Sequence, residues 1–111
     1  MALSHATAGQ AVNVQPLGAR LLDTKTSALF KSQDLELIHL VLAKGKSLPP
    51  HKVAGEITIQ CLEGRLDISV DGHSQVLEPG QLLFLQRNAL HAVTALEDAS
   101  GLVTIALRNG G

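Results

Sequence analysis

Turn-forming residues divide most of this chain into short apolar runs, and this division constrains the fold more than any other feature. Turns are indicated at residues 32–34, 44–45, 63–64, 71–72 and 79–80. The runs between them have the length of β-strands, and none forms a convincing amphipathic helix. Many short strands separated by closely spaced turns are typical of an all-β sandwich or barrel.

Two runs show strand patterns most clearly. Residues 35–43 (LELIHLVLA) are apolar on both alternating faces, as in a strand buried on two sides. A helix could also give this run, but its length and the turn that follows favour a strand. Residues 65–70 (RLDISV) alternate between apolar and polar, and they lead into Asp71-Gly72, the strongest two-residue hairpin signal in the chain. We also expect a short edge strand at 14–22, a polar turn at 97–101, and further strands at 24–31, 74–77, 81–85, 91–95 and 102–107.

The composition limits the function classes. A chain of 111 residues makes one domain with its own core. Its net charge is −1, without a run of Lys or Arg, so binding to nucleic acid or anionic lipid has no electrostatic support. The single cysteine, Cys61, excludes an internal disulfide and a multi-cysteine zinc site. Aromatic residues make up 2%, Phe30 and Phe84, so a large flat ligand would find little aromatic surface.

The N-terminal residues indicate a loose arm and a cytoplasmic location. Residues 1–12 are small and polar without a period, and no basic region precedes a continuous apolar stretch. No segment is apolar for long enough to span a membrane. Because 45% of the residues are hydrophobic, we expect either a well-filled core or apolar surface that a second subunit covers in a homodimer.

Two similar units each place a histidine beside an apolar strand. Residues 45–64 (GKSLPPHKVAGEITIQCLEG) give a turn, a short strand carrying His51, a second turn and a longer apolar strand. Residues 78–91 (EPGQLLFLQRNALH) give a turn, an apolar strand, a turn and His91. Two histidines placed alike predict one shared interior pocket.

In these two units the chain resembles the cupins. The first cupin motif is a Gly, five residues, His-x-His, a Glu and a strand ending in Gly, and Gly45, His51 and Leu62-Glu63-Gly64 match that frame. The second motif is Pro-Gly-Asp, an apolar strand, a Pro-x-Gly turn and a His, and Pro79-Gly80 and His91 match it, although the turn reads Gln-Arg-Asn.

The resemblance covers roughly residues 35–107. It implies an all-β double-stranded β-helix, the RmlC-like jelly-roll barrel. Residues 13–111 would then form one cupin-like β-barrel domain after an arm of residues 1–12.

The resemblance also implies a metal site that this chain has lost in part. Cupins usually hold a divalent metal (Fe, Mn, Zn or Ni) with two His and one Glu of the first motif and one His of the second. His51 and His91 occupy two of these positions, but Val53 and Ile57 occupy the others. Two imidazoles fall short of the set for catalytic zinc or non-haem iron. Glu56 is one residue early, so it should point away from the site unless a bulge in the preceding turn rotates it back.

Three further residues, Cys61, His39 and His73, carry side chains that can bind a metal. Cys61 has the strand parity of Ile57 and Ile59, so we expect it in the barrel interior, either as a soft ligand or as a buried apolar side chain. His39 lies in the middle of a strand, and either a ligand or a packed or interface histidine would fit. His73 follows a hairpin turn and should be solvated.

These observations predict a pocket and leave its function open. One hypothesis is the binding of a small molecule, with an incomplete metal site. A second is a metal-dependent or histidine-base enzyme of isomerase, decarboxylase or dioxygenase type on a small polar substrate. A third is a sensor or interaction module, and a fourth is that both histidines lack a function. We expect the pocket to be lined by His51, Val53, Ile57, Ile59, Cys61, His91 and Val93.

Overall fold

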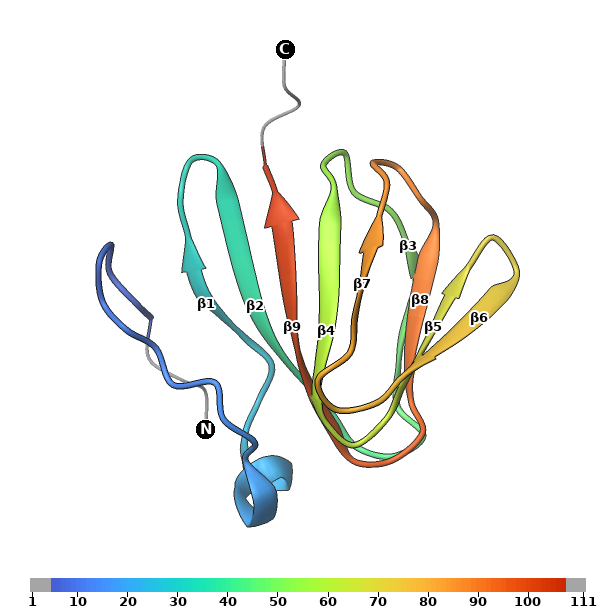
Figure 1. Cartoon of the computed structure of the whole chain (residues 1–111), viewed down its shortest axis with the longest axis horizontal. Helices are drawn as coiled ribbons and strands as arrows, with labels where there is room; N and C mark the ends of the chain where they lie inside the picture. The colour runs from blue at the N-terminus through green and yellow to red at the C-terminus, as the bar shows by residue number, and fades with distance from the viewer. Residues whose placement is uncertain (1–4, 108–111) are drawn as a thin grey trace.

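Short strands make up most of the computed structural model, which describes residues 5–107. Five of them form one antiparallel sheet in the order β1-β2-β9-β4-β7, and four form a second sheet in the order β3-β8-β5-β6 (Figure 1). Among the described residues the elements are η1 (Gly18–Asp23), β1 (Ser27–Lys31), β2 (Leu35–Leu42), β3 (Ser47–His51), β4 (Ile57–Glu63), β5 (Leu66–Val70), β6 (His73–Leu77), β7 (Leu82–Leu85), β8 (His91–Ala95) and β9 (Ala99–Ala106).

The two sheets enclose a core made from alternate residues of their strands. In β4, Ile57, Ile59 and Cys61 are buried, and in β5 so are Leu66 and Ile68. The side chains between them face the outside, as the pleat of a strand requires. This double-sheet architecture confirms the all-β jelly-roll fold predicted from the sequence.

Local turn chemistry explains the β5–β6 hairpin. Asp71 and Gly72 have φ angles of 49° and 81°, and the strands pair in register from Leu66–Leu77 to Val70–His73. Positive φ at both central residues is the requirement of the type I′ turn, which Asp-Gly adopts readily.

The predicted edge strand at 14–22 is wrong. Residues Gly18–Asp23 form the 3₁₀ helix η1, which buries Leu17 and Leu21. The backbone hydrogen bonds here are local, because the Arg20 N–H donates to the Leu17 carbonyl and the Thr24 N–H donates to the Leu21 carbonyl, each at 3.1 Å, whereas an edge strand would bond to a neighbouring strand.

The predicted turn at 97–101 is too long, because β9 already begins at Ala99. Gly101 lies inside this strand, opposite Cys61 of β4. A Cβ atom at Gly101 would lie 2.6 Å from the Gln60 carbonyl oxygen. This glycine therefore permits close packing of two strands and does not mark a turn.

Residues 5–12 form no helix or strand, although the Ala6 N–H donates a hydrogen bond to the Leu29 carbonyl at 2.7 Å. Residues 1–4 lie outside the described part of the chain, so the predicted arm of residues 1–12 stays a prediction. In residues 5–107 we find no helix of the length and apolarity needed to cross a membrane.

Candidate functional site

A cavity of about 190 Å³ lies between the two sheets. Strands β2, β4 and β9 of the larger sheet and strands β3 and β8 of the smaller sheet contribute its walls. Almost all of the lining is aliphatic, and the polar members are two histidines and one threonine. The lining residues are Thr26, Ile38, Leu40, Leu48, His51, Val53, Ile57, Ile59, His91, Val93, Val103 and Ile105.

Pairing of β3 with β8 brings the two histidines together. His51 and His91 are directly opposite in the ladder, and their ring centroids are 4.3 Å apart with the planes tilted by 53°. Pro49 and Pro50 precede His51 in β3, which is the edge strand of its sheet, where the missing proline N–H groups cost no ladder hydrogen bond. His91 is 3% exposed, whereas His51 is exposed, so His91 is the inner member of the pair.

The backbone fixes the tautomer that each ring adopts in its neutral form. Nδ1 of His51 lies 3.1 Å from the Pro49 carbonyl oxygen, and Nδ1 of His91 lies 3.0 Å from the Ala89 carbonyl oxygen. A carbonyl oxygen only accepts, so Nδ1 carries the hydrogen and donates in each case. In the neutral imidazole Nε2 then has a free lone pair. Each histidine is thereby prepared to accept a hydrogen bond through Nε2.

A sequence model of the cupin domain matches residues 38–106, which include every strand from β3 to β9 and most of β2. The chain belongs to the cupin family. No curated protein sequence matches it.

Solved structures agree with the fold. A conserved protein of unknown function from Streptococcus pyogenes superposes with a TM-score of 0.75 at 20% identity, covering 96% of both chains. An RmlC-like cupin from Desulfovibrio desulfuricans gives a TM-score of 0.73 at 25% identity, covering 87% of this chain and 96% of its own. A cupin superfamily protein from Desulfitobacterium hafniense gives 0.72 at 20% identity, covering 75% and 76%.

The donor set of this cupin does not fit the divalent metal of its family. The motif positions that carry Val53 and Ile57 face the cavity, so apolar side chains stand where a His and a Glu would be ligands. Glu56 is exposed and lies with Thr58 and Phe84 along a hollow on the opposite face of β4. Within residues 5–107 there is no group of three or more His, Cys, Asp or Glu side chains that could hold a metal ion. His51 and His91 would have to bind a metal without a carboxylate, which falls short of the usual set.

The remaining candidate residues lie elsewhere. Cys61 is fully buried and is not among the residues that line the cavity; its thiol donates to the backbone carbonyls of Glu63 and Gly64 at 3.5 and 3.6 Å. His39 points away from the cavity, because its neighbours Ile38 and Leu40 line it. His73 is exposed at the start of β6.

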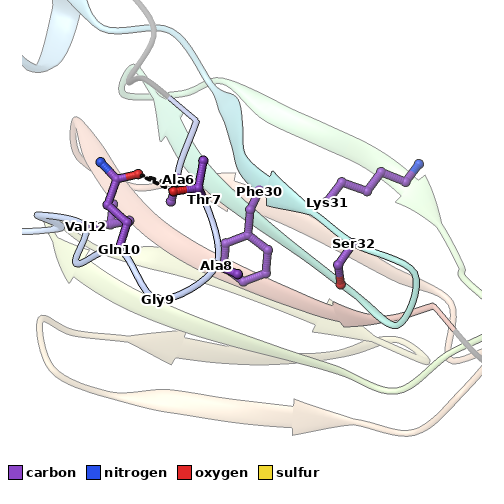
Figure 2. A pocket seen from close by; sticks show the side chains of 9 residues that line it. All are labelled: Ala6, Thr7, Ala8, Gly9, Gln10, Val12, Phe30, Lys31 and Ser32. Carbon is purple, nitrogen blue, oxygen red and sulfur yellow. Dashed lines mark hydrogen bonds between the residues drawn. The ribbon is translucent and has the colours of Figure 1, made fainter.

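A larger hollow of about 440 Å³ lies outside the barrel, between residues 6–12 and the end of β1 (Figure 2). Small side chains, Phe30, Lys31 and Ser32 form much of its wall. A hydrogen bond between Thr7 and Gln10 closes the loop above it. Lys31 is the single ionisable residue in its lining, so this hollow does not bring two ionisable side chains together.

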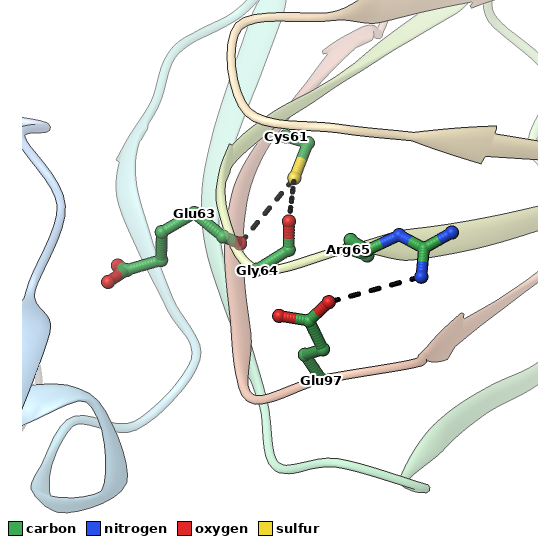
Figure 3. A network of polar contacts seen from close by, with 5 residues as sticks. All are labelled: Cys61, Glu63, Gly64, Arg65 and Glu97. Atoms are coloured by element: carbon green, nitrogen blue, oxygen red, sulfur yellow. Dashed lines mark hydrogen bonds and ion pairs between the residues drawn. The ribbon is translucent and has the colours of Figure 1, made fainter.

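A polar cluster that the sequence did not reveal surrounds Glu63. Its carboxylate accepts hydrogen bonds from the N–H groups of Leu17 at 2.7 Å and Gly18 at 3.0 Å, and from the hydroxyl of Ser100. Figure 3 shows this carboxylate directed away from Cys61, while Arg65 pairs with Glu97 at 4.0 Å on the other side. The sequence indicates Glu63 only as part of a turn motif, and nothing in its local sequence indicates a contact 46 residues away.

Proposed function

We propose that this cupin binds a compact, largely aliphatic small molecule in the barrel cavity, through a donor group held by His51 and His91. The observation that carries the proposal is the pair of Nδ1 hydrogen bonds to backbone carbonyls. These bonds leave the Nε2 atom of each histidine free to accept a hydrogen bond. The residues that line the cavity include no Asp, Glu, Lys or Arg. A hydroxyl or amine hydrogen complements this arrangement, whereas a carboxylate would meet two acceptors.

The size of the cavity supports a small ligand. Its 190 Å³ is below the range of roughly 300–1,000 Å³ that is usual for drug-sized ligands. It corresponds to about six water molecules at roughly 30 Å³ each. The aliphatic wall favours a short branched chain, because apolar surface that leaves water contributes roughly 25 cal/mol per Å².

Nuclear magnetic resonance titration with matched probes tests the proposal. Isobutanol should shift the methyl signals of Ile57 and Ile59 saturably, and isobutyrate at neutral pH should not. His91→Leu should weaken isobutanol binding by about three- to tenfold, the usual contribution of one hydrogen bond. His73→Leu, which changes an exposed histidine, should leave it unchanged. Absence of saturable shifts in wild-type protein with either probe, or equal binding of both, would refute the proposal.

General base catalysis is a second candidate, and the same geometry favours it. An imidazole with Nδ1 held by a carbonyl and Nε2 free can take a proton from a bound substrate. The chain contains no Tyr, so a His–Tyr acid–base pair is not available to it. Proton exchange with solvent at a carbon of a bound substrate, lost in His91→Leu, is the observation that would favour this candidate over simple binding.

We also propose that a second copy of the chain covers the part of the outer face of the larger sheet that carries Leu35, Leu82 and Phe84. Leu82 and Phe84 of β7 are 57% and 55% exposed there, and Leu35 of β2 is 42% exposed. Large apolar side chains grouped on one sheet face are characteristic of a subunit contact.

A further inference from the structure

The segment from Leu17 to Asp23 is fastened to the outer face of the larger sheet mainly through one carboxylate. We call residues 17–23 the strap. Two strap N–H groups, those of Leu17 and Gly18, donate to the two oxygens of Glu63. Leu17 and Leu21 are 7% and 4% exposed, so the strap also covers apolar surface. Hydrogen bonds to an ionised acceptor are stronger than those to a neutral one, so the charge of Glu63 matters for this fastening.

A bulge directs Glu63 to the strap. In the pairing of β4 with β9, Cys61 lies opposite Gly101 and Glu63 lies opposite Ser100, with a register shift between them. The extra residue, Leu62, gives Glu63 the outward parity that strict alternation from Cys61 would deny it. Ser100 then donates its hydroxyl hydrogen to the same carboxylate.

His39 is a further ionisable group on this face. It is fully buried, and neither of its ring nitrogens has a hydrogen-bond partner among the described residues. Directly opposite on β1 is Ser27, whose hydroxyl is also buried without a partner among them. In the pairing of β2, β9 and β4, His39 lies opposite Leu102, and Glu63 lies opposite Ser100, two residues earlier on β9. Ser27 and Ser100 are neutral, and Arg20 and Asp23 of the strap are exposed, so Glu63 is the charged group that we consider for His39. A buried imidazole without partners resists protonation, because its cation would lack both water and a hydrogen-bond acceptor.

We propose that Glu63 and His39 form a proton-operated latch: ionised Glu63 holds the strap closed, and protonation of His39 opens it. A proton taken from solvent by His39 creates a buried cation on the sheet face that also carries the Glu63 carboxylate. The carboxylate can then accept hydrogen bonds either from the imidazolium or from the strap N–H groups. Opening the strap hydrates His39, frees Glu63 to pair with it, and exposes Leu17 and Leu21.

The pKa shifts give the direction of the pH response. Burial lowers the pKa of His39 below its ordinary 6.5, although the charge of Glu63 opposes this shift. The closed state therefore loses stability as the pH falls below 6.5, where His39 in the open state takes up a proton first. For Glu63, burial raises the pKa, but hydrogen bonds from Ser100, Leu17 and Gly18 outweigh burial and lower it below 4.5. Glu63 thus stabilises the closed strap above pH 4.5, and the interval from pH 6.5 to 4.5 isolates the effect of His39.

Amide hydrogen exchange of Leu17 and Gly18, followed by nuclear magnetic resonance between pH 7.5 and 5.0, tests the latch. Their protection factors, corrected for the intrinsic pH dependence of exchange, should fall by up to about 30-fold at pH 5.0. This limit follows from the 1.5 units between pH 6.5 and 5.0, at tenfold per unit. Protection of the Ile59 amide in β4 should stay unchanged, which shows that the barrel itself remains folded.

Three variants separate the roles. His39→Leu should abolish the fall, whereas His73→Leu, at an exposed histidine of the other sheet, should behave as wild type. Glu63→Gln should reduce protection of both strap amides at every pH. If His39→Leu does not fold, the wild-type ring of His39 provides the test, because its titration midpoint must coincide with the midpoint of strap opening. A wild-type fall below about threefold, non-coincident midpoints, or full protection in Glu63→Gln would overturn the latch.

Discussion

Restoring the two missing cupin ligands offers a direct test of the cavity geometry. Val53 and Ile57 both line the cavity with His51 and His91, so Val53→His combined with Ile57→Glu places three imidazoles and one carboxylate around one space. Without metal the double variant should be less stable than wild type by about 3 kcal/mol, because Ile57 is 4% exposed and a carboxyl replaces its aliphatic side chain. Zinc at a concentration 100 times its dissociation constant should raise the free energy of unfolding of the double variant by about 2.7 kcal/mol.

Thermal unfolding with and without zinc measures this gain. At about 4 °C per kcal/mol for a domain of this size, zinc should raise the melting temperature of the double variant by about 10 °C. The control is Val53→His combined with Thr58→Glu, because Thr58 follows Ile57 in β4 and faces the other side of the sheet. Equal zinc responses of the variant and this control would refute the reasoning, since the carboxylate would then act regardless of the face that carries it.

Three further predictions concern packing, reactivity and assembly. Gly55→Ala should cost about 3 kcal/mol or more in urea unfolding, because its Cβ would lie 1.7 Å from the Ala106 carbonyl oxygen. Gly45→Ala, which has open space but a φ of +83°, should cost about 1 kcal/mol, and equal losses would contradict the steric argument. Burial raises the pKa of the Cys61 thiol, so its reaction with a disulfide reagent should be far slower in native protein than in urea; equal rates would be inconsistent with this environment. Phe84→Gln should weaken self-association in a light-scattering dilution series, and a wild-type protein that stays monomeric throughout would exclude the proposed dimer.

Much of the fold could be predicted because its determinants are local. The Asp71-Gly72 turn, the alternation in β5 and the two-sided burial of β2 each depend on residues within one or two neighbouring strands. The strap could not be predicted in this way. Leu17 and Leu21 are buried, and the Leu17 N–H donates a hydrogen bond to Glu63 of β4. The sequence around these two residues resembles a strand as much as a turn.

The candidate site also has features that the sequence predicts and features that only the structure reveals. His51 and His91 could be brought together from sequence, because two similar motifs place them, and the ladder sets their rings 4.3 Å apart. Their tautomer depends on carbonyls two residues upstream, which only backbone geometry reveals. The face of His39 depends on the register of β2, and the face of Glu63 depends on a bulge. Both lie beyond what an alternating pattern can determine.

The cavity and the latch use opposite faces of the same three strands. Strand β2 carries Ile38 and Leu40 inward and His39 outward, and the inner faces of β4 and β9 likewise line the cavity while Glu63 and Ser100 face out. Without the bulge, β4 could not place Cys61 in the core and Glu63 on the outer face. Glu63 is two residues after Cys61, so strict alternation would direct it into the core as well. No side chain belongs to both, so we expect the proposed ligand binding and the proposed strap opening to be chemically independent. If Glu63→Gln changed isobutanol affinity, the coupling would have to pass through the strands themselves, as a shift in the β4–β9 pairing.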